Sequence, residues 1–211
     1  MRLVPSRTLP GLLLVLASAC EPRLYTEGGP VADAAWTPPE NSWPVGAPPE
    51  DLRPEGMGVG RVVYDVRGLD QHGDELSLWQ FHGSWVLLDV STMWCAPCRD
   101  LAIGTEALWQ EYRDRGLVTV TLLLEDTHGD PPKVADLKQW ATLASLDPEH
   151  DYELITAPVV SDPKGRSGSI EAIERGQYPA LLLISPDLQV TRRIEPVTDV
   201  RVREVLAELD L

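Results

Sequence analysis

Cysteine, histidine and basic side chains are scarce in this chain of 211 residues, and each shortage excludes some classes of function. There are 18 Lys and Arg against 33 Asp and Glu, which gives a formal net charge of −15. A surface of that sign repels phosphate backbones, so no nucleic acid is expected as a partner. The histidines show no metal-ligand spacing, so two cysteines alone leave a zinc site without its other ligands. The four are His72, His82, His128 and His150.

Residues 1–20 are predicted to be a signal peptide rather than a transmembrane helix. Arg2 and Arg7 form a positive start, and the apolar run Leu9–Ala19 is too short to span a bilayer comfortably. The chain is therefore expected to work outside the cytoplasm, where disulfides can persist.

The end of this signal, "LASAC", resembles a bacterial lipobox, in which the cysteine is lipidated and becomes the new N-terminus. Ala17 stands where leucine is usual. The alternative is an ordinary cleaved signal with an incidental cysteine. The resemblance implies a lipid anchor at Cys20, which leaves Cys95 and Cys98 to pair with each other or with another protein.

Residues 21–60 are predicted to be a tether, because they contain eight prolines and six glycines and show no helical or strand period. At roughly 3.1 Å per residue, an extended tether of this length would reach roughly 100 Å. Trp36 and Trp43 are unusual in a linker, and they either dock on the domain or lie loosely.

Residues 61–211 alternate between strand and helix patterns, which predicts one α/β domain with a mostly parallel core. "WVLLDVS" at 85–91 is a buried strand, and a helix is expected from Cys95 to Tyr112. The other expected strands are a hairpin around 71–74 and the segments 117–124, 157–162, 179–185 and 188–195; the other expected helices are 131–147, 167–175 and 198–209.

Cys95 and Cys98 lie where a buried strand passes into a helix, and this edge of a parallel sheet is where α/β sites collect. Unpaired N–H groups at a helix start stabilise a thiolate and lower a cysteine pKa from about 8.5 to roughly 3.5–7.5. Cys95 is therefore the expected nucleophile, and Cys98 the expected resolving thiol. A purely structural disulfide is the alternative, although so short a loop removes little chain entropy.

"WCAPC" after a buried strand resembles the active site of thioredoxin-like proteins, and residues 61–211 resemble their exported branch. That branch contains the TlpA-like and cytochrome c maturation thiol–disulfide oxidoreductases. The supporting stretches are an N-terminal hairpin and first core strand, "LVTVTLLLEDTHGDPPKVADLKQWA" and "GQYPALLLISPDLQV". The resemblance implies a thioredoxin-like fold, with a central mixed sheet, helices on both faces and an N-terminal β-hairpin.

The resemblance also assigns roles to single residues. Cys95 would attack and Cys98 would resolve, with Trp94 shielding this redox disulfide. Pro179 matches a cis-proline that faces the disulfide, and Tyr178 would lie beside the substrate groove.

Asp89, six residues before the first cysteine, matches a buried aspartate that accepts the proton of the resolving thiol in thioredoxin. Burial raises a carboxyl pKa, so it can accept a proton near neutrality. The sequence departs from the pattern of these relatives at two places. Val90 and Ser91 stand where an aromatic pair is usual, which concerns surface recognition, and Ile103 stands where a helix-kinking proline is usual, which concerns helix shape.

We expect an extracytoplasmic, membrane-tethered thiol–disulfide oxidoreductase without cofactor or metal. Expected partners are thiol or disulfide proteins, with apocytochrome c and metallochaperones as candidates, and a membrane redox partner. A thioredoxin-fold copper chaperone using the two cysteines and His128 is one alternative. A peroxiredoxin is another, since "TMWC" places Thr92 three residues before Cys95, although Leu88 replaces that family's proline.

Overall fold

The computed structural model describes residues 36–143, 154–173 and 177–209. The predicted signal peptide and Cys20 lie outside these ranges. None of the described helices is long and apolar enough to cross a membrane.

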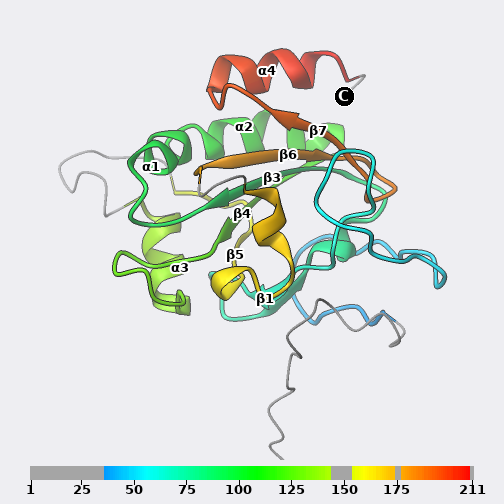
Figure 1. Ribbon diagram of the computed structural model, residues 1–211, viewed down its shortest axis with the longest axis horizontal. Coiled ribbons are helices and arrows are strands. Elements are labelled where there is room, and N and C mark those ends of the chain that lie inside the picture. The colour runs from blue at the N-terminus through cyan, green and yellow to red at the C-terminus, as the bar shows by residue number, and fades with distance from the viewer. Residues whose placement is uncertain (1–35, 144–153, 174–176, 210–211) are drawn as a thin grey trace, which may run out of the picture.

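Five strands form one mixed sheet in the order β5–β4–β3–β6–β7 (Figure 1). The central strand β3 is parallel to β4, which is parallel to β5, whereas β6 runs antiparallel to both β3 and β7. The strands are β3 Trp85–Ser91, β4 Leu117–Leu123, β5 Val159–Ser161, β6 Ala180–Ile184 and β7 Val190–Ile194. The predicted α/β fold with a central mixed sheet is confirmed.

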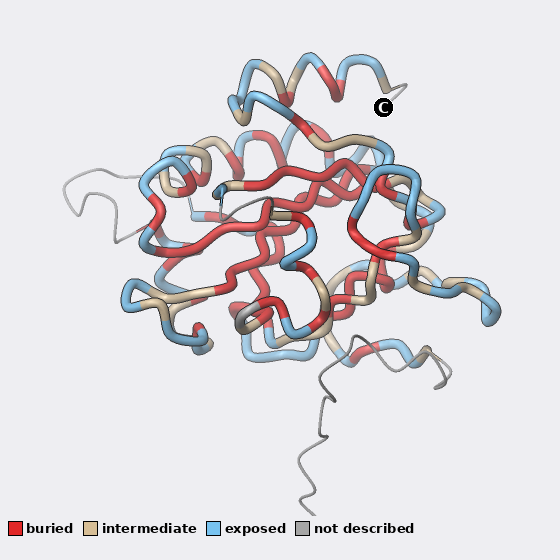
Figure 2. Tube along the Cα trace, in the orientation of Figure 1, coloured by how far each residue is buried: buried red, intermediate tan, exposed pale blue. Residues whose placement is uncertain are grey.

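The strand β3 is apolar almost throughout because both of its faces are buried (Figure 2). Leu88 and Val90 join the larger core, while Leu87 faces the smaller core. Side chains alternate along a strand, so Asp89 shares the face of Leu87. The carboxylate is thereby placed inside the protein and not at its surface.

Helices cover both faces of the sheet (Figure 1). Helix α3 packs on one face through Leu137 and Trp140, and α4 packs on the other through Val202 and Leu206. As predicted, Thr198 caps α4. The helices are α1 Ala96–Ala102, α2 Thr105–Tyr112, α3 Val134–Ala141 and α4 Asp199–Ala207, with short 3-10 helices η1 Leu78–Phe81, η2 Arg113–Arg115, η3 Pro163–Gly165 and η4 Ser169–Ala172.

The helix expected from Cys95 to Tyr112 is two helices, and that prediction is corrected here. It breaks at Ile103 and Gly104, although Ile103 replaces the proline that kinks related helices. The Gly104 N–H bonds to the Leu101 carbonyl at 3.1 Å, a tighter turn than an α-helix makes. Glycine is also among the poorest helix formers, so this position is a natural place for the break.

The predicted hairpin forms from β1, Arg67–Leu69, and β2, Glu75–Ser77, as a separate antiparallel pair. Asp70 is fully buried in this turn. Its carboxylate accepts hydrogen bonds from the backbone N–H groups of His72, Gly73 and Asp74. The turn therefore has an internal reason to form where the sequence predicts it.

The sequence predicts an extended tether up to residue 60, but residues 36–60 contact the domain. The segment 36–43 contacts the hairpin, Gly46 donates to the Gln80 carbonyl and Gly60 donates to the Val190 carbonyl. The Trp36 indole donates a hydrogen bond to Ser77 Oγ at 3.0 Å, and the Trp43 indole donates to Asp70 Oδ2 at 2.6 Å. Both rings pack against the larger core. These contacts hold the described part of the predicted tether against the domain; where the domain begins stays a prediction.

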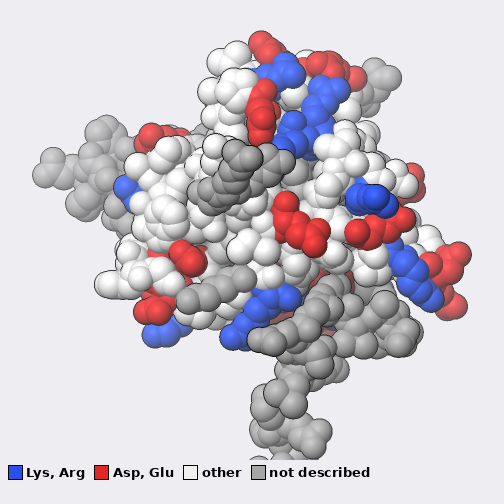
Figure 3. Space-filling model, viewed as in Figure 1, with Lys and Arg blue, Asp and Glu red and all other residues white. Residues whose placement is uncertain are grey.

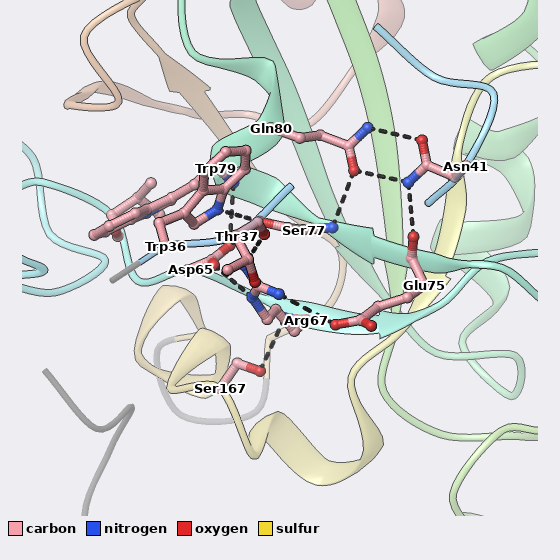
Figure 4. Close-up of polar contacts among 11 residues, drawn as sticks. Trp36, Thr37, Asn41, Asp65, Arg67, Glu75, Ser77, Trp79, Gln80 and Ser167 are labelled. Atoms are coloured by element: carbon pink, nitrogen blue, oxygen red, sulfur yellow. Dashed lines mark hydrogen bonds and ion pairs between the residues drawn. The ribbon is translucent and has the colours of Figure 1, made fainter. Parts of the chain in front are cut away.

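A polar cluster ties this segment to the hairpin (Figure 4). Asp65 Oδ1 accepts from Ser77 Oγ at 2.6 Å and from the Trp79 N–H at 3.1 Å, while Oδ2 pairs with Arg67 Nε at 2.8 Å. Arg67 also donates to the Thr37 carbonyl at 2.8 Å. Burial raises the pKa of Asp65, and the Arg67 charge opposes that rise. We call this cluster the hairpin clamp; it consists of Trp36, Thr37, Asp65, Arg67, Ser77 and Trp79.

Candidate active site

Cys95 and Cys98 form a disulfide at the start of α1, with their Cα atoms 5.3 Å apart. The strand β3 ends just before them, so the pair lies at the carboxyl edge of the parallel strands. The Cys98 N–H donates to Cys95 Sγ at 3.2 Å. After reduction the same N–H would stabilise a Cys95 thiolate.

The two sulfurs differ in access. Cys95 is 6% exposed and Cys98 is fully buried. The expected attacking thiol is therefore the more exposed of the two. The division of roles between them stays a prediction.

An aromatic pair lies beside the disulfide. Trp94 directly precedes Cys95, and its ring meets the Tyr178 ring edge-on, with centroids 5.5 Å apart. The Tyr178–Pro179 peptide bond is cis, as the resemblance implies. The structure therefore brings together Trp94, Tyr178 and the cysteines, although the two halves of the group are about eighty residues apart in the chain.

Glu125 is a residue of this site that the sequence analysis missed. It follows β4, and its carbonyl accepts a hydrogen bond from the Met93 N–H at 3.0 Å. Its carboxylate accepts from the Trp94 indole at 2.8 Å. Burial, and then the Glu125 charge, raise the pKa of Tyr178. Its position at the end of a buried parallel strand is the signal that could have identified it.

Asp89 is 3% exposed, and burial raises its pKa from 3.8 to about 7. A hydrogen bond from Ser91 Oγ to Asp89 Oδ1, 2.7 Å long, opposes that rise. Ser91 is one of the departures from the family pattern, and here it is the group that holds the carboxylate. A carboxyl with a pKa near neutrality can both accept and release a proton at physiological pH.

A small cavity lies beside Asp89. Asp89 and Thr119 are among the residues that line it. Asp89 Oδ2 and Thr119 Oγ1 are buried without a hydrogen-bond partner among the described residues. Gly104, at the break between α1 and α2, and Asp199, at the start of α4, also line it. Buried polar atoms of this kind are commonly satisfied by water, so the cavity is suited to connect the carboxyl with solvent.

The two alternative functions of the cysteines, copper binding and peroxide reduction, can each be compared with the structure. His128 is exposed on the loop after β4, where its ring lies 3.2 Å from Thr127 Oγ1. The described part of the chain contains no group of three His, Cys, Asp or Glu side chains suited to hold a metal ion. Thr92, the residue that favours a peroxiredoxin, is buried, and its hydroxyl has no partner among the described residues.

The fold and this site define a thioredoxin-like protein with a Cys-x-x-Cys disulfide at the start of its first α-helix. The chain belongs to the AhpC/TSA family, whose model matches residues 59–193. No curated protein sequence matches the chain significantly.

Three solved structures illustrate the similarity in fold. The thioredoxin domain of a thiol-disulfide oxidoreductase from Bacteroides vulgatus is 17% identical, with a TM-score of 0.56 over 72% of this chain and 98% of that one. The exposed lipoprotein thioredoxin of Streptococcus pneumoniae is 22% identical, with a TM-score of 0.52 over 69% and 99%. A peroxidoxin from Mycobacterium tuberculosis is 18% identical, with a TM-score of 0.51 over 73% and 94%.

Proposed function

We propose that this chain is an extracytoplasmic thiol–disulfide oxidoreductase that exchanges its Cys95–Cys98 pair with cysteines of partner proteins. The observation that carries the proposal is a disulfide at a helix start with a cis-proline loop beside it. Similarity to proteins named as thiol-disulfide oxidoreductases supports it. The short signal and a similar exposed lipoprotein support a lipid anchor at Cys20 that faces the periplasm or extracytoplasmic space.

In the reducing direction, the Cys95 thiolate attacks one sulfur of a partner disulfide. The partner S–S bond breaks, one partner thiolate leaves, and a mixed disulfide forms. Cys98 then loses its proton to the Asp89 carboxylate and attacks Cys95 Sγ. The second partner thiolate leaves, the Cys95–Cys98 bond forms, and two electrons have passed to the partner. The reverse sequence oxidises a partner dithiol.

Trapping tests this division of labour. A Cys98→Ser variant cannot resolve the mixed disulfide, so it should accumulate covalent adducts that a non-reducing gel resolves and dithiothreitol removes. A Cys95→Ser variant should accumulate far fewer. Mass spectrometry of the adducts would identify the partners, for which apocytochrome c, metallochaperones and a membrane redox protein are our candidates. Equal trapping by both variants would contradict the proposal.

The direction of exchange follows from the reduction potential of the pair. A value near about −270 mV is expected of a reductant, and one near about −120 mV of an oxidant. Equilibration with glutathione buffers would measure it.

The anchor has its own test. A Cys20→Ser variant should move from the membrane to the soluble extracytoplasmic fraction, because the acylated cysteine is absent. Unchanged membrane association would contradict lipidation, whatever the redox activity.

Peroxide reduction is a second candidate, favoured by the buried Thr92 hydroxyl without a described partner and by the peroxidoxin similarity. The Cys95 thiolate would attack one oxygen of hydrogen peroxide, so that the O–O bond breaks, hydroxide leaves and Cys95 becomes a sulfenic acid. The Cys98 thiol would then condense with the sulfenic acid, which forms the disulfide and releases water. Hydrogen peroxide consumption with dithiothreitol as reductant tests this. A Thr92→Val variant that consumes peroxide at the wild-type rate would remove the observation that favours it.

A further inference from the structure

Glu125 holds the Trp94 ring in place beside the disulfide. The indole N–H points to the Glu125 carboxylate, 2.8 Å away, and the backbones meet through the Met93 N–H and the Glu125 carbonyl. Trp94 is 46% exposed, so part of its ring remains accessible to a group of another molecule. The side chain is thus fixed at its polar end and open elsewhere.

Tyr178 completes the arrangement from the other side. Its ring meets Trp94 edge-on, and it directly precedes the cis-proline. The Glu125 charge acts on the phenol and helps to raise its pKa. One carboxylate therefore lies close to two aromatic side chains at the rim of the dithiol site.

The Glu125 carboxylate has no ion pair within the described ranges. Arg99, on α1, donates to the Met93 carbonyl at 2.9 Å and not to this carboxylate. Farther away, Arg192 pairs with Glu208 and Arg203 with Glu111. Figure 3 shows basic side chains next to acidic ones over α4 and β7. The charge at the rim is thus available to an incoming group.

We propose that Trp94, Tyr178 and Glu125 form a recognition site for a lysine or arginine side chain that a partner carries beside its reactive cysteine. A cation is attracted to the face of an indole or phenol ring, and a nearby carboxylate adds direct charge attraction. At a partly exposed site such effects amount to about fivefold in a rate or affinity. This inference rests on the proposed function and names the class of partner.

The site acts in the attack step described above. While the Cys95 thiolate displaces one sulfur of the partner disulfide, the partner cation lies against Trp94 and Glu125. Bonds and electrons are those of ordinary exchange: one S–S bond forms as another breaks. The cation changes the rate at which the mixed disulfide forms, and no further reactant is needed.

Three disulfide-linked peptides that differ in one residue test this inference. The residue next to cysteine is Lys, Gln or Glu, and the rate of reduction by the fully reduced protein is measured for each. Glu125→Gln keeps an acceptor for the indole and removes the charge, whereas Glu125→Ala removes both. Asp187→Asn is the matched control, since Asp187 is exposed in the β6–β7 turn, at the end of β6 away from Pro179.

The wild type should reduce the Lys peptide faster than the Glu peptide, and Glu125→Gln should lower that ratio by up to about fivefold, the size expected of a partly exposed charge pair. Asp187→Asn should leave the ratio unchanged. The inference is overturned if Glu125→Gln leaves the ratio unchanged, if only Glu125→Ala lowers it, or if Asp187→Asn lowers it equally. Failure of the wild type to reduce even the Gln peptide would overturn the proposed function itself, and this inference with it.

Discussion

Asp65 in the hairpin clamp is partly buried and Asp89 on β3 is buried, and burial raises the pKa of both, yet their surroundings differ. Asp65 has partners on both oxygens, including Arg67. Among the described residues Asp89 has one side-chain partner, Ser91, its Oδ2 has none, and the residue lines a small cavity. A satisfied carboxylate stabilises a fold, whereas an unsatisfied one can change its protonation state. The difference is between a carboxylate that its partners hold and one that can titrate near neutral pH.

The largest expected effect is on the pH dependence of stability, which should differ between the wild type and an Asp89→Asn variant. The Asp89 pKa of about 7 lies above its ordinary 3.8, so the stability from this group is fully present below about pH 4 and is lost as the pH rises through about 7. Each pKa unit corresponds to about 1.4 kcal/mol, which sums to a loss on the order of 4 kcal/mol. An Asp89→Asn variant should lack this loss. Urea unfolding of the oxidised proteins across that range measures it, and parallel curves would contradict the assignment.

Removal of the clamp carboxylate should act with the opposite sign. An Asp65→Ala variant leaves Arg67 and Ser77 without their partly buried partner, so the free energy of unfolding should fall by about 3 kcal/mol. Glu75→Gln is the control, because Glu75 is the exposed partner of the same arginine and should change stability by less than about 1 kcal/mol. Equal effects of the two variants in urea unfolding would show that the clamp is no more than a surface ion pair.

Exchange kinetics should reverse the ranking of the two aspartates. Asp89→Asn should slow the resolution of a mixed disulfide about tenfold to a hundredfold, since proton transfer by a placed side chain contributes at least that much. Ser91→Ala should keep the maximal rate but shift the pH profile of the rate to higher pH, because the hydrogen bond from Ser91 lowers the Asp89 pKa. Stopped-flow measurements across neutral pH give both results. A wild-type profile for Asp89→Asn would leave Asp89 without a chemical role.

The smallest effect is expected where the predicted tether docks. Trp36→Phe keeps most of the buried ring but loses the indole bond to Ser77 Oγ, so it should lower stability by about 1 kcal/mol. Its exchange rate should match the wild type. Thermal unfolding measures the change, and a marked loss of exchange activity would mean that the clamp and the dithiol site are coupled.

The strands and the cysteine pair could be predicted because their signals are local. The apolar run of β3, the two cysteines three residues apart and the Thr198 cap can each be seen within a few neighbouring residues. The cis bond before Pro179 came from the resemblance, since no local pattern distinguishes it.

The rest depends on partners far away in the chain. Trp36 and Trp43 are docked by residues 41 and 27 positions away, so composition alone indicated a tether. The helix break at Gly104 depends on turn geometry that apolar spacing does not report. Glu125 joins the site only because β4 lies beside β3 in the sheet.

The docking of Trp36 also sets how far the enzyme can search for partners. If Cys20 is the membrane anchor, only the residues between 20 and 36 separate the lipid from the docked segment. Fully extended at roughly 3.1 Å per residue, they span at most about 50 Å, half of what a tether ending at residue 60 would allow. With that anchor, the effective concentration of the dithiol would be highest for partners within a short radius of the same membrane.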